Sequence, residues 1–157
     1  MPTGDNWLES CLAALPRTRV TVFGDFCLDA YWLIDRDTSE LSVETGLPVH
    51  RVRRQRYSLG GAGNVAANLA DLGVATVRAV GLIGDDLFGR QMRERLLQQH
   101  VDADGLLDTQ EDWQTLVYAK PCLGDDGRVL RRQHQTHQFA CVSGFTPVLS
   151  VVKFLFA

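Results

Sequence analysis

A glycine-rich turn that leads into a small-residue helix is the part of this chain best suited to binding chemistry. The turn reads Gly60-Gly61-Ala62-Gly63-Asn64, and residues 65–72 after it are rich in alanine. Glycine adopts positive φ readily and lets the backbone approach a bound molecule closely. A helix start offers unpaired N–H groups, and the Asn64 amide can donate and accept hydrogen bonds. The pattern indicates a site for a small polyhydroxylated ligand, with Asn64 as the expected helix N-cap.

A carboxylate upstream of this turn is the expected second half of the site. Residues 20–23 form a short apolar run that ends at Gly24, which is typical of a buried strand. Asp29 follows this run, where we expect the strand to have opened into a loop. A carboxylate has several lone pairs and can orient two vicinal hydroxyls. Taken alone, Asp29 is more simply interpreted as a loop residue that caps a local N–H, but the glycine turn favours the ligand role.

The elements that must position these residues alternate between strands and helices. The predicted helices lie at 6–15, at 64–72 and from Asp85 or Asp86 to about His100, and the predicted strands lie at 20–23 and 76–83. Such alternation predicts an α/β fold with a parallel sheet. Residues 47–57 carry arginines that a buried parallel strand would not tolerate, so we expect a solvent-facing flap there. Segments 115–120 and 128–132 are predicted to form a β-hairpin.

Three motifs resemble the N-terminal signature of the ribokinase-like (PfkB) carbohydrate kinases. They are residues 20–29, which end at Asp29; Gly60-Gly61-Ala62-Gly63-Asn64 with Gly73, Gly81 and Gly84; and Gly84-Asp85-Asp86-Leu87-Phe88-Gly89. Leu28-Asp29-Ala30-Tyr31-Trp32 and Gly60-Gly61-Ala62 are most similar to the heptose-phosphate kinase branch. The resemblance implies a parallel-sheet sandwich with a small β lid, whose strands we expect at about 41–57 and 115–132. It also implies ATP-dependent phosphorylation of a sugar or sugar phosphate that is bound by Asp29, Gly60, Gly61 and Asn64.

The family's later Asp-Thr-x-Gly-Ala-Gly-Asp motif, which carries its catalytic base and anion hole, does not occur in the 157 residues. The nearest cluster, Gly124-Asp125-Asp126-Gly127, is more typical of a hairpin turn. We therefore expect residues 1–138 to be a truncated kinase domain that supplies the sugar-binding half. No catalytic residue is assigned to it. ATP and Mg²⁺ belong to the intact family enzyme, and neither is assigned to this chain.

The last part of the chain, residues 139–157, is atypically apolar, with Lys153 as its only charge. A truncated or frame-shifted gene product is one interpretation of this tail, and a genuine C-terminal strand or helix is the other. If the sheet stops here, an open edge would favour self-association. A homodimer through the lid is the other self-contact that we expect.

Two other functions fit parts of the sequence. A catalytically inactive sugar-binding remnant would keep the same site without the chemistry. An NAD-binding module would use Gly61-x-Gly63-x-x-Ala66 with Asp85 as the ribose-binding acid, but the convincing first strand ends far upstream at Gly24.

Charged residues of the flap and the hairpin are the remaining candidates for ligand contacts. Arg51, Arg53, Arg54 and Arg56 could hold a substrate phosphate, although arginines on such a flap are often only solvated, and Lys120 could lie near the sugar. The net charge of −3 and the lack of an aromatic stacking platform or basic motif with the arginines argue against nucleic acid. The four cysteines and the histidines have no metal-ligand spacing, so no metal site is expected.

The location predicted for the protein is the cytoplasm. Asp5 and Glu9 precede any apolar run, which is not typical of a signal peptide, and no apolar stretch is long enough to cross a membrane. The expected partner is therefore a sugar or sugar phosphate, with no membrane involved.

Overall fold

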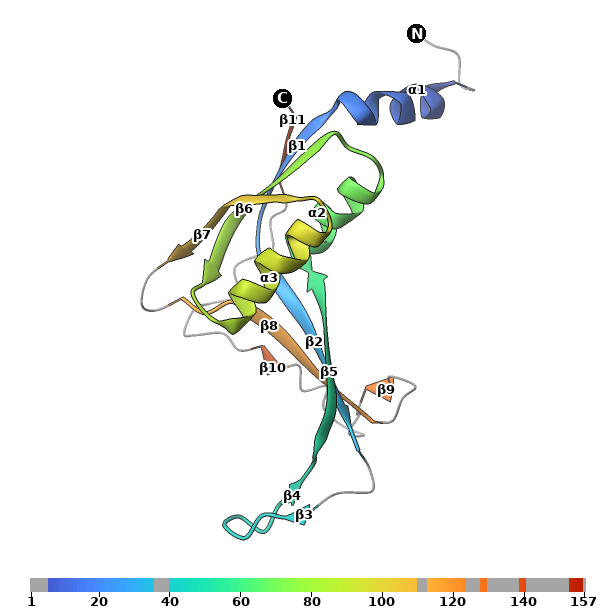
Figure 1. Cartoon of the computed structure of the whole chain (residues 1–157). Coiled ribbons are helices and arrows are strands. Elements are labelled where there is room, and N and C mark those ends of the chain that lie inside the picture. Colours follow the sequence, from blue (N-terminus) through green and yellow to red (C-terminus); the bar gives the residue numbers. More distant parts are fainter. Residues whose placement is uncertain are drawn as a thin grey trace.

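Two β-sheets organise the chain in the computed structural model (Figure 1). The structure describes residues 6–35, 40–109, 113–123, 128–129, 139–140 and 153–156. The predicted turn at 124–127 and most of the apolar tail lie outside these residues. The first sheet is covered by two helices, and the second projects away from them.

The first sheet is parallel at its centre. Its strands are β1 (Arg19–Phe23), β6 (Thr76–Gly84) and β7 (Asp102–Thr109), hydrogen-bonded in that order. Helices α2 (Gly61–Asp71) and α3 (Leu87–Gln98) pack against it, while α1 (Trp7–Ala14) and the short helix η1 (Leu15–Arg17) precede β1. The α/β class predicted from the alternation of elements is confirmed. The side chains that fill the core include Val22, Ala66, Ala79, Met92 and Leu96, all 0% exposed.

The second sheet is built around β2 (Phe26–Ile34). On one side β2 pairs antiparallel with β5 (Val52–Gly60), and on the other it pairs parallel with β8 (Leu116–Leu123). The short strands β9 (Arg128–Val129) and β10 (Phe139–Ala140) both pair antiparallel with β8. The β8–β9 hairpin pairs residues 122–123 with 128–129, so its first strand extends past the predicted 115–120, and residues 130–132 lie outside the described residues. A separate two-stranded ribbon, β3 (Glu40–Leu41) with β4 (Pro48–Val49), lies at the far end of this sheet in Figure 1.

The predicted loop at Asp29 is wrong, because Asp29 lies in the middle of strand β2. Only Gly24 and Asp25 separate β1 from β2, and the chain passes from one sheet to the other across them. Phe26, Leu28 and Ala30 are buried, so the segment has an apolar face to pack as a strand.

The start of helix α2 also differs from the prediction. The helix begins at Gly61 with Gly60 at the N-cap position, and no side chain caps it. Asn64 is therefore inside the first turn rather than at the cap. Helix formation begins earlier than expected because Gly60 is extended (φ −129°, ψ 170°) and ends β5 directly at the helix.

Part of the apolar tail forms a strand. Lys153–Phe156 (β11) pairs antiparallel with β1, along the edge opposite β6. This edge of β1 is therefore paired within the chain. Among the described residues no helix is long and apolar enough to cross a bilayer.

Asp86 links the start of helix α3 to Thr115, the residue just before strand β8 of the second sheet. Its carboxylate accepts hydrogen bonds from the N–H of Gly89 at 2.7 Å and from the N–H of Thr115 at 2.8 Å. The Thr115 hydroxyl in turn accepts one from the N–H of Gly84 at 2.9 Å. Any side chain at Gly84 would meet Asp86 and Thr115. The motif from Gly84 to Gly89 is thus explained by this junction. Of the two helix starts predicted, Asp85 and Asp86, the structure has Asp86 as the N-cap.

Replacing Asp86 with alanine is expected to lower the free energy of unfolding by about 1–2 kcal/mol, because a helix cap and a second bond are lost. Partial burial raises the pKa of the Asp86 carboxyl, but the hydrogen bonds from Thr115 and Gly89 outweigh it and hold that pKa below its ordinary value. The contribution is therefore present at neutral pH and is lost as pH falls through the folded pKa. Urea titrations at several pH values measure it.

Asp85→Ala is the matched control, since Asp85 is exposed and has only a 3.5 Å ion pair with Arg90. We expect it to change stability by less than about 0.5 kcal/mol. Equal losses in the two variants would contradict the capping role of Asp86.

Candidate functional site

The Asp29 carboxylate lies on one face of the second sheet, in a row of polar side chains. In the strand register Asp29 is opposite Ser58 on β5 and opposite Tyr118 on β8. Residues directly opposite one another present their side chains on the same face. A carboxylate, a hydroxyl and a phenol therefore share this row, and all three residues are half-buried.

The next row along the same face combines a tyrosine with two cations. Tyr31 is opposite Arg56 on β5 and opposite Lys120 on β8. The Arg56 guanidinium carbon lies 5.1 Å from the Tyr31 ring centroid, and the Lys120 Nζ lies 5.0 Å from it. Lys120 also donates to the Tyr31 hydroxyl at 3.5 Å.

An ion pair connects the two rows. The Lys120 Nζ lies 2.7 Å from Oδ1 of Asp29, and both side chains are about a quarter exposed (23% and 25%). Partial burial alone would lower the pKa of the Lys120 ammonium, but the hydrogen bond and charge of Asp29 outweigh it and raise that pKa. Lys120 is therefore charged at neutral pH, and its contact with Asp29 was not predicted from the sequence.

The glycine turn lies next to the first row, two residues farther along the strands, where Gly60 is opposite Cys27. Gly61 has φ +52°, a conformation that favours glycine, and the next N–H, that of Ala62, donates to the Asp25 carbonyl at 2.9 Å. A Cβ at Gly60 would lie 2.9 Å from Sγ of Cys27 and 3.8 Å from Cγ of Asp29. The turn therefore lies directly against the strand that carries Asp29.

The Cys27 thiol behind this turn is buried. Burial, followed by the charges of Asp29 and Asp25, raises the pKa of this thiol to about 11. A protonated, enclosed thiol is a poor nucleophile, so Cys27 packs the turn and takes no chemical role.

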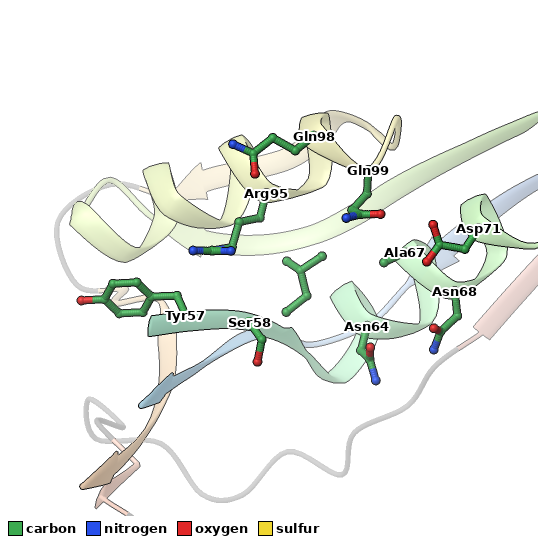
Figure 2. A pocket seen from close by; sticks show the side chains of 10 residues that line it. Tyr57, Ser58, Asn64, Ala67, Asn68, Asp71, Arg95, Gln98 and Gln99 are labelled. Atoms are coloured by element: carbon green, nitrogen blue, oxygen red, sulfur yellow. The ribbon is translucent and has the colours of Figure 1, made fainter. Parts of the chain in front are cut away.

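Asn64 is exposed and lies at the rim of a polar depression between α2, α3 and β5 (Figure 2). In Figure 2 the Asn64 amide and the Ser58 hydroxyl point the same way, away from α3. Because Ser58 shares its face with Asp29, this direction brings Asn64 toward the Asp29 side of the sheet.

The depression itself was not predicted from the sequence. It has a volume of about 240 Å³ and is lined by Tyr57, Ser58, Leu59, Asn64, Ala67, Asn68, Asp71, Arg95, Gln98 and Gln99. The Arg95 guanidinium lies 6.0 Å from the Tyr57 ring centroid, and its Nε is buried without a hydrogen-bond partner in the described part of the chain. No motif signals this cavity, because it depends on how the two helices pack.

Two of the flap arginines predicted as phosphate contacts lie farther from Asp29, with Arg51 just before β5 and Arg53 near its start. Arg51 pairs with Glu40 at 3.9 Å near the outer ribbon, and Arg53 falls where the β2–β5 register shifts. The register instead sets Arg56 opposite Tyr31. Arg56 was a predicted phosphate contact like the other flap arginines, but its position beside Tyr31 was not predicted. Ser58 was not among the predicted contacts, and the two-residue period of a strand that passes Asp29 is the signal that could have found it.

No metal centre is formed by the described residues, since they contain no group of three or more His, Cys, Asp or Glu side chains that could hold an ion. The dinucleotide alternative needs the glycine turn to follow a strand of the parallel sheet. The turn follows β5 of the second sheet instead. The structure therefore argues against an NAD site at Gly61.

Comparison with known proteins agrees with this architecture. Residues 17–120 match the model of the pfkB family carbohydrate kinases. The chain belongs to this family, and the expected ribokinase-like fold is confirmed.

Curated relatives and a solved structure give the same result. The chain is 41% identical over 123 residues to a D-beta-D-heptose 7-phosphate kinase of Bordetella bronchiseptica, an alignment that covers 78% of this chain and 37% of the relative. It is 33% identical over 130 residues to the bifunctional protein HldE of Magnetococcus marinus, covering 82% of this chain and 26% of that protein. A putative sugar kinase from Clostridium perfringens has a TM-score of 0.50 at 21% identity, over 72% of this chain and 33% of that structure. The chain thus spans between 26% and 37% of the length of these relatives.

Proposed function

We propose that this chain forms the sugar-binding part of a kinase that phosphorylates a sugar phosphate of the heptose type. The observation that carries the proposal is the position of the Asp29 carboxylate, on a half-buried polar sheet face directly against the Gly60–Gly61 turn. The identity to a relative named as a heptose 7-phosphate kinase supports the substrate class. The second sheet would act as the lid over this sugar.

In this proposal each residue has a separate binding task. Asp29 accepts hydrogen bonds from two sugar hydroxyls, and Ser58 and Asn64 add a hydroxyl and an amide on the same side. Gly61 acts through the turn itself: the position where its side chain would lie is taken by the Asp25 carbonyl, and the turn places the start of α2 against the strand that carries Asp29. Fixing a substrate in one orientation supplies a large part of catalysis in phosphoryl transfer.

The nucleotide and its metal ion do not fit the residues described. ATP and Mg²⁺ supply the phosphoryl group and its charge neutralisation in the family. The anion-hole motif is absent from the 157 residues, and the described residues offer no acidic cluster for an ion. We therefore assign this chain the binding of the sugar only. A catalytically inactive sugar-binding protein is the second candidate, and the same absence favours it.

Two further properties belong to this proposal. We place the protein in the cytoplasm, where free thiols such as those of Cys11, Cys27 and Cys122 stay reduced. A homodimer would form through the second sheet, since the outer half of its strand β5 is exposed from Val52 to Arg56.

Replacing Asp29 with asparagine is expected to abolish sugar-dependent thermal stabilisation while the chain stays folded. A ligand at 100 times its Kd stabilises a protein by about 2.7 kcal/mol, which is several degrees in Tm. Differential scanning fluorimetry with D-beta-D-heptose 7-phosphate measures the shift. Asp104→Asn, an exposed aspartate on β7, is the control and should keep the full shift. An undiminished shift in Asp29→Asn would refute the proposed site.

A further inference from the structure

The carboxylate proposed to bind sugar hydroxyls is already engaged by a lysine. Lys120 lies 2.7 Å from Oδ1 of Asp29, so one oxygen of the carboxylate is occupied when no ligand is bound. A sugar that uses both oxygens must move the ammonium away. An unphosphorylated sugar brings no group that would attract Lys120 elsewhere.

An alternative position for the ammonium is available one row along the sheet. Tyr31 is two residues after Asp29, about 6.6 Å farther along the strand. The ring of Tyr31 has Lys120 within 5.0 Å and Arg56 within 5.1 Å. An anionic group held beside this ring would face two cations, and a guanidinium and an ammonium are the usual partners of a phosphate.

The spacing of the two rows matches the shape of a sugar phosphate. Hydroxyls of the ring would lie at Asp29 and Ser58, and an exocyclic phosphate would extend along β2 to the row of Arg56, Tyr31 and Lys120. The Lys120 side chain has a flexible four-carbon stem, so the ammonium can reach from Asp29 to a phosphate beside Tyr31. Both partners of the ion pair are only about a quarter exposed, so breaking it is unfavourable unless a charge-assisted contact with phosphate replaces it.

We propose that Lys120 makes the site selective for phosphorylated sugars, by masking Asp29 until a substrate phosphate, held jointly with Arg56, draws the ammonium away. Phosphate recognition and hydroxyl recognition are then coupled through one side chain. Free sugars are disfavoured because they must break the ion pair without compensation. The inference rests on the proposed function and adds the residues that set its selectivity.

Isothermal titration of three compounds against four proteins tests this. The compounds are D-beta-D-heptose 7-phosphate, the same heptose without phosphate, and inorganic phosphate. The proteins are the parent chain, Lys120→Met, Arg56→Gln and the control Arg51→Gln, whose arginine pairs with Glu40 near the outer ribbon.

Lys120→Met should change the two sugar affinities in opposite directions. The Kd for free heptose should fall about threefold, because Asp29 is no longer masked. The Kd for the heptose phosphate should rise about tenfold or more, because a charge-assisted hydrogen bond is lost. Arg56→Gln should weaken only the heptose phosphate, by a similar factor. Inorganic phosphate should bind weakly to the parent chain and should not bind to Lys120→Met or Arg56→Gln. The control Arg51→Gln should have the same Kd values as the parent for all three compounds.

The outcomes separate this inference from the proposed function. If the parent binds neither heptose, the proposed function fails and the inference fails with it. If the parent binds both but Lys120→Met weakens both equally, Lys120 is an ordinary sugar contact and only the selectivity inference is overturned. Arg56→Gln tests the phosphate position independently, since Arg56 is exposed and its loss should leave the fold intact. An unchanged heptose-phosphate Kd in that variant would also overturn the inference.

Discussion

Replacing Gly61 with valine is expected to lower the free energy of unfolding by about 3 kcal/mol or more and to abolish sugar binding. At φ +52° a side chain is strained, which costs about 1–2 kcal/mol. The added Cβ would also lie 2.6 Å from the backbone carbonyl oxygen of Asp25. That oxygen accepts the Ala62 N–H, so it cannot move without disturbing the helix start. Crowding of this kind costs a further 1–3 kcal/mol, roughly.

The control variant Gly73→Val separates the cost of backbone strain from the cost of crowding against Asp25. Gly73 also has positive φ, at +86°, but a Cβ there would meet nothing within 4 Å. The control should therefore lose only the strain energy and keep its sugar-dependent thermal shift. Chemical denaturation of both variants measures the difference. Equal losses would mean that contact with Asp25 contributes nothing, and normal sugar binding by Gly61→Val would remove the turn from the site.

No sugar-dependent ATP turnover is expected from a chain of these 157 residues. General-base catalysis contributes about 10²- to 10⁴-fold, and stabilisation of the transferring charge contributes a comparable factor. The family carries both in a motif that this sequence lacks. The combined loss should exceed about 10⁴-fold and bring the rate below detection.

A coupled ADP-release assay with Mg²⁺, ATP and D-beta-D-heptose 7-phosphate measures this turnover. The intact heptose 7-phosphate kinase of Bordetella bronchiseptica is the positive control. Turnover that scales with the concentration of this chain and requires the sugar would show that an unrecognised base is present, and would contradict the assignment of sugar binding alone.

Local sequence signals predicted the helices better than the strands. The apolar spacing of Phe88, Met92 and Leu96, with Asp86 as cap, predicted α3, and the structure confirms both. Strand β2 was missed, because the passage from the first sheet to the second occurs over Gly24 and Asp25 with no change of composition. Strand β7 was missed as well, since its charged residues Asp102, Asp104 and Asp108 obscure the apolar pattern.

The candidate site was also predictable only in part. The glycine turn and Asp29 were indicated by resemblance to a family. Lys120 and Arg56 were candidate ligand contacts, but their positions beside Asp29 and Tyr31 were not predicted, because they depend on strand register across long distances in the chain. Tyr31 and Lys120 are 89 residues apart in sequence yet hydrogen-bonded, and Arg56 reaches the same row through an antiparallel pairing. No local pattern encodes such a register.

Backbone amide shifts in a ¹H–¹⁵N spectrum, recorded while D-beta-D-heptose 7-phosphate is added, test the central claim most directly. The amides of Asp29, Ser58, Gly61 and Asn64 should shift together and saturate with one Kd, while those of Gln98 and Gln99, across the polar depression on α3, stay unchanged. Shifts confined to Gln98, Gln99 and Arg95, or no shifts at all, would contradict a sugar site at the Asp29 face.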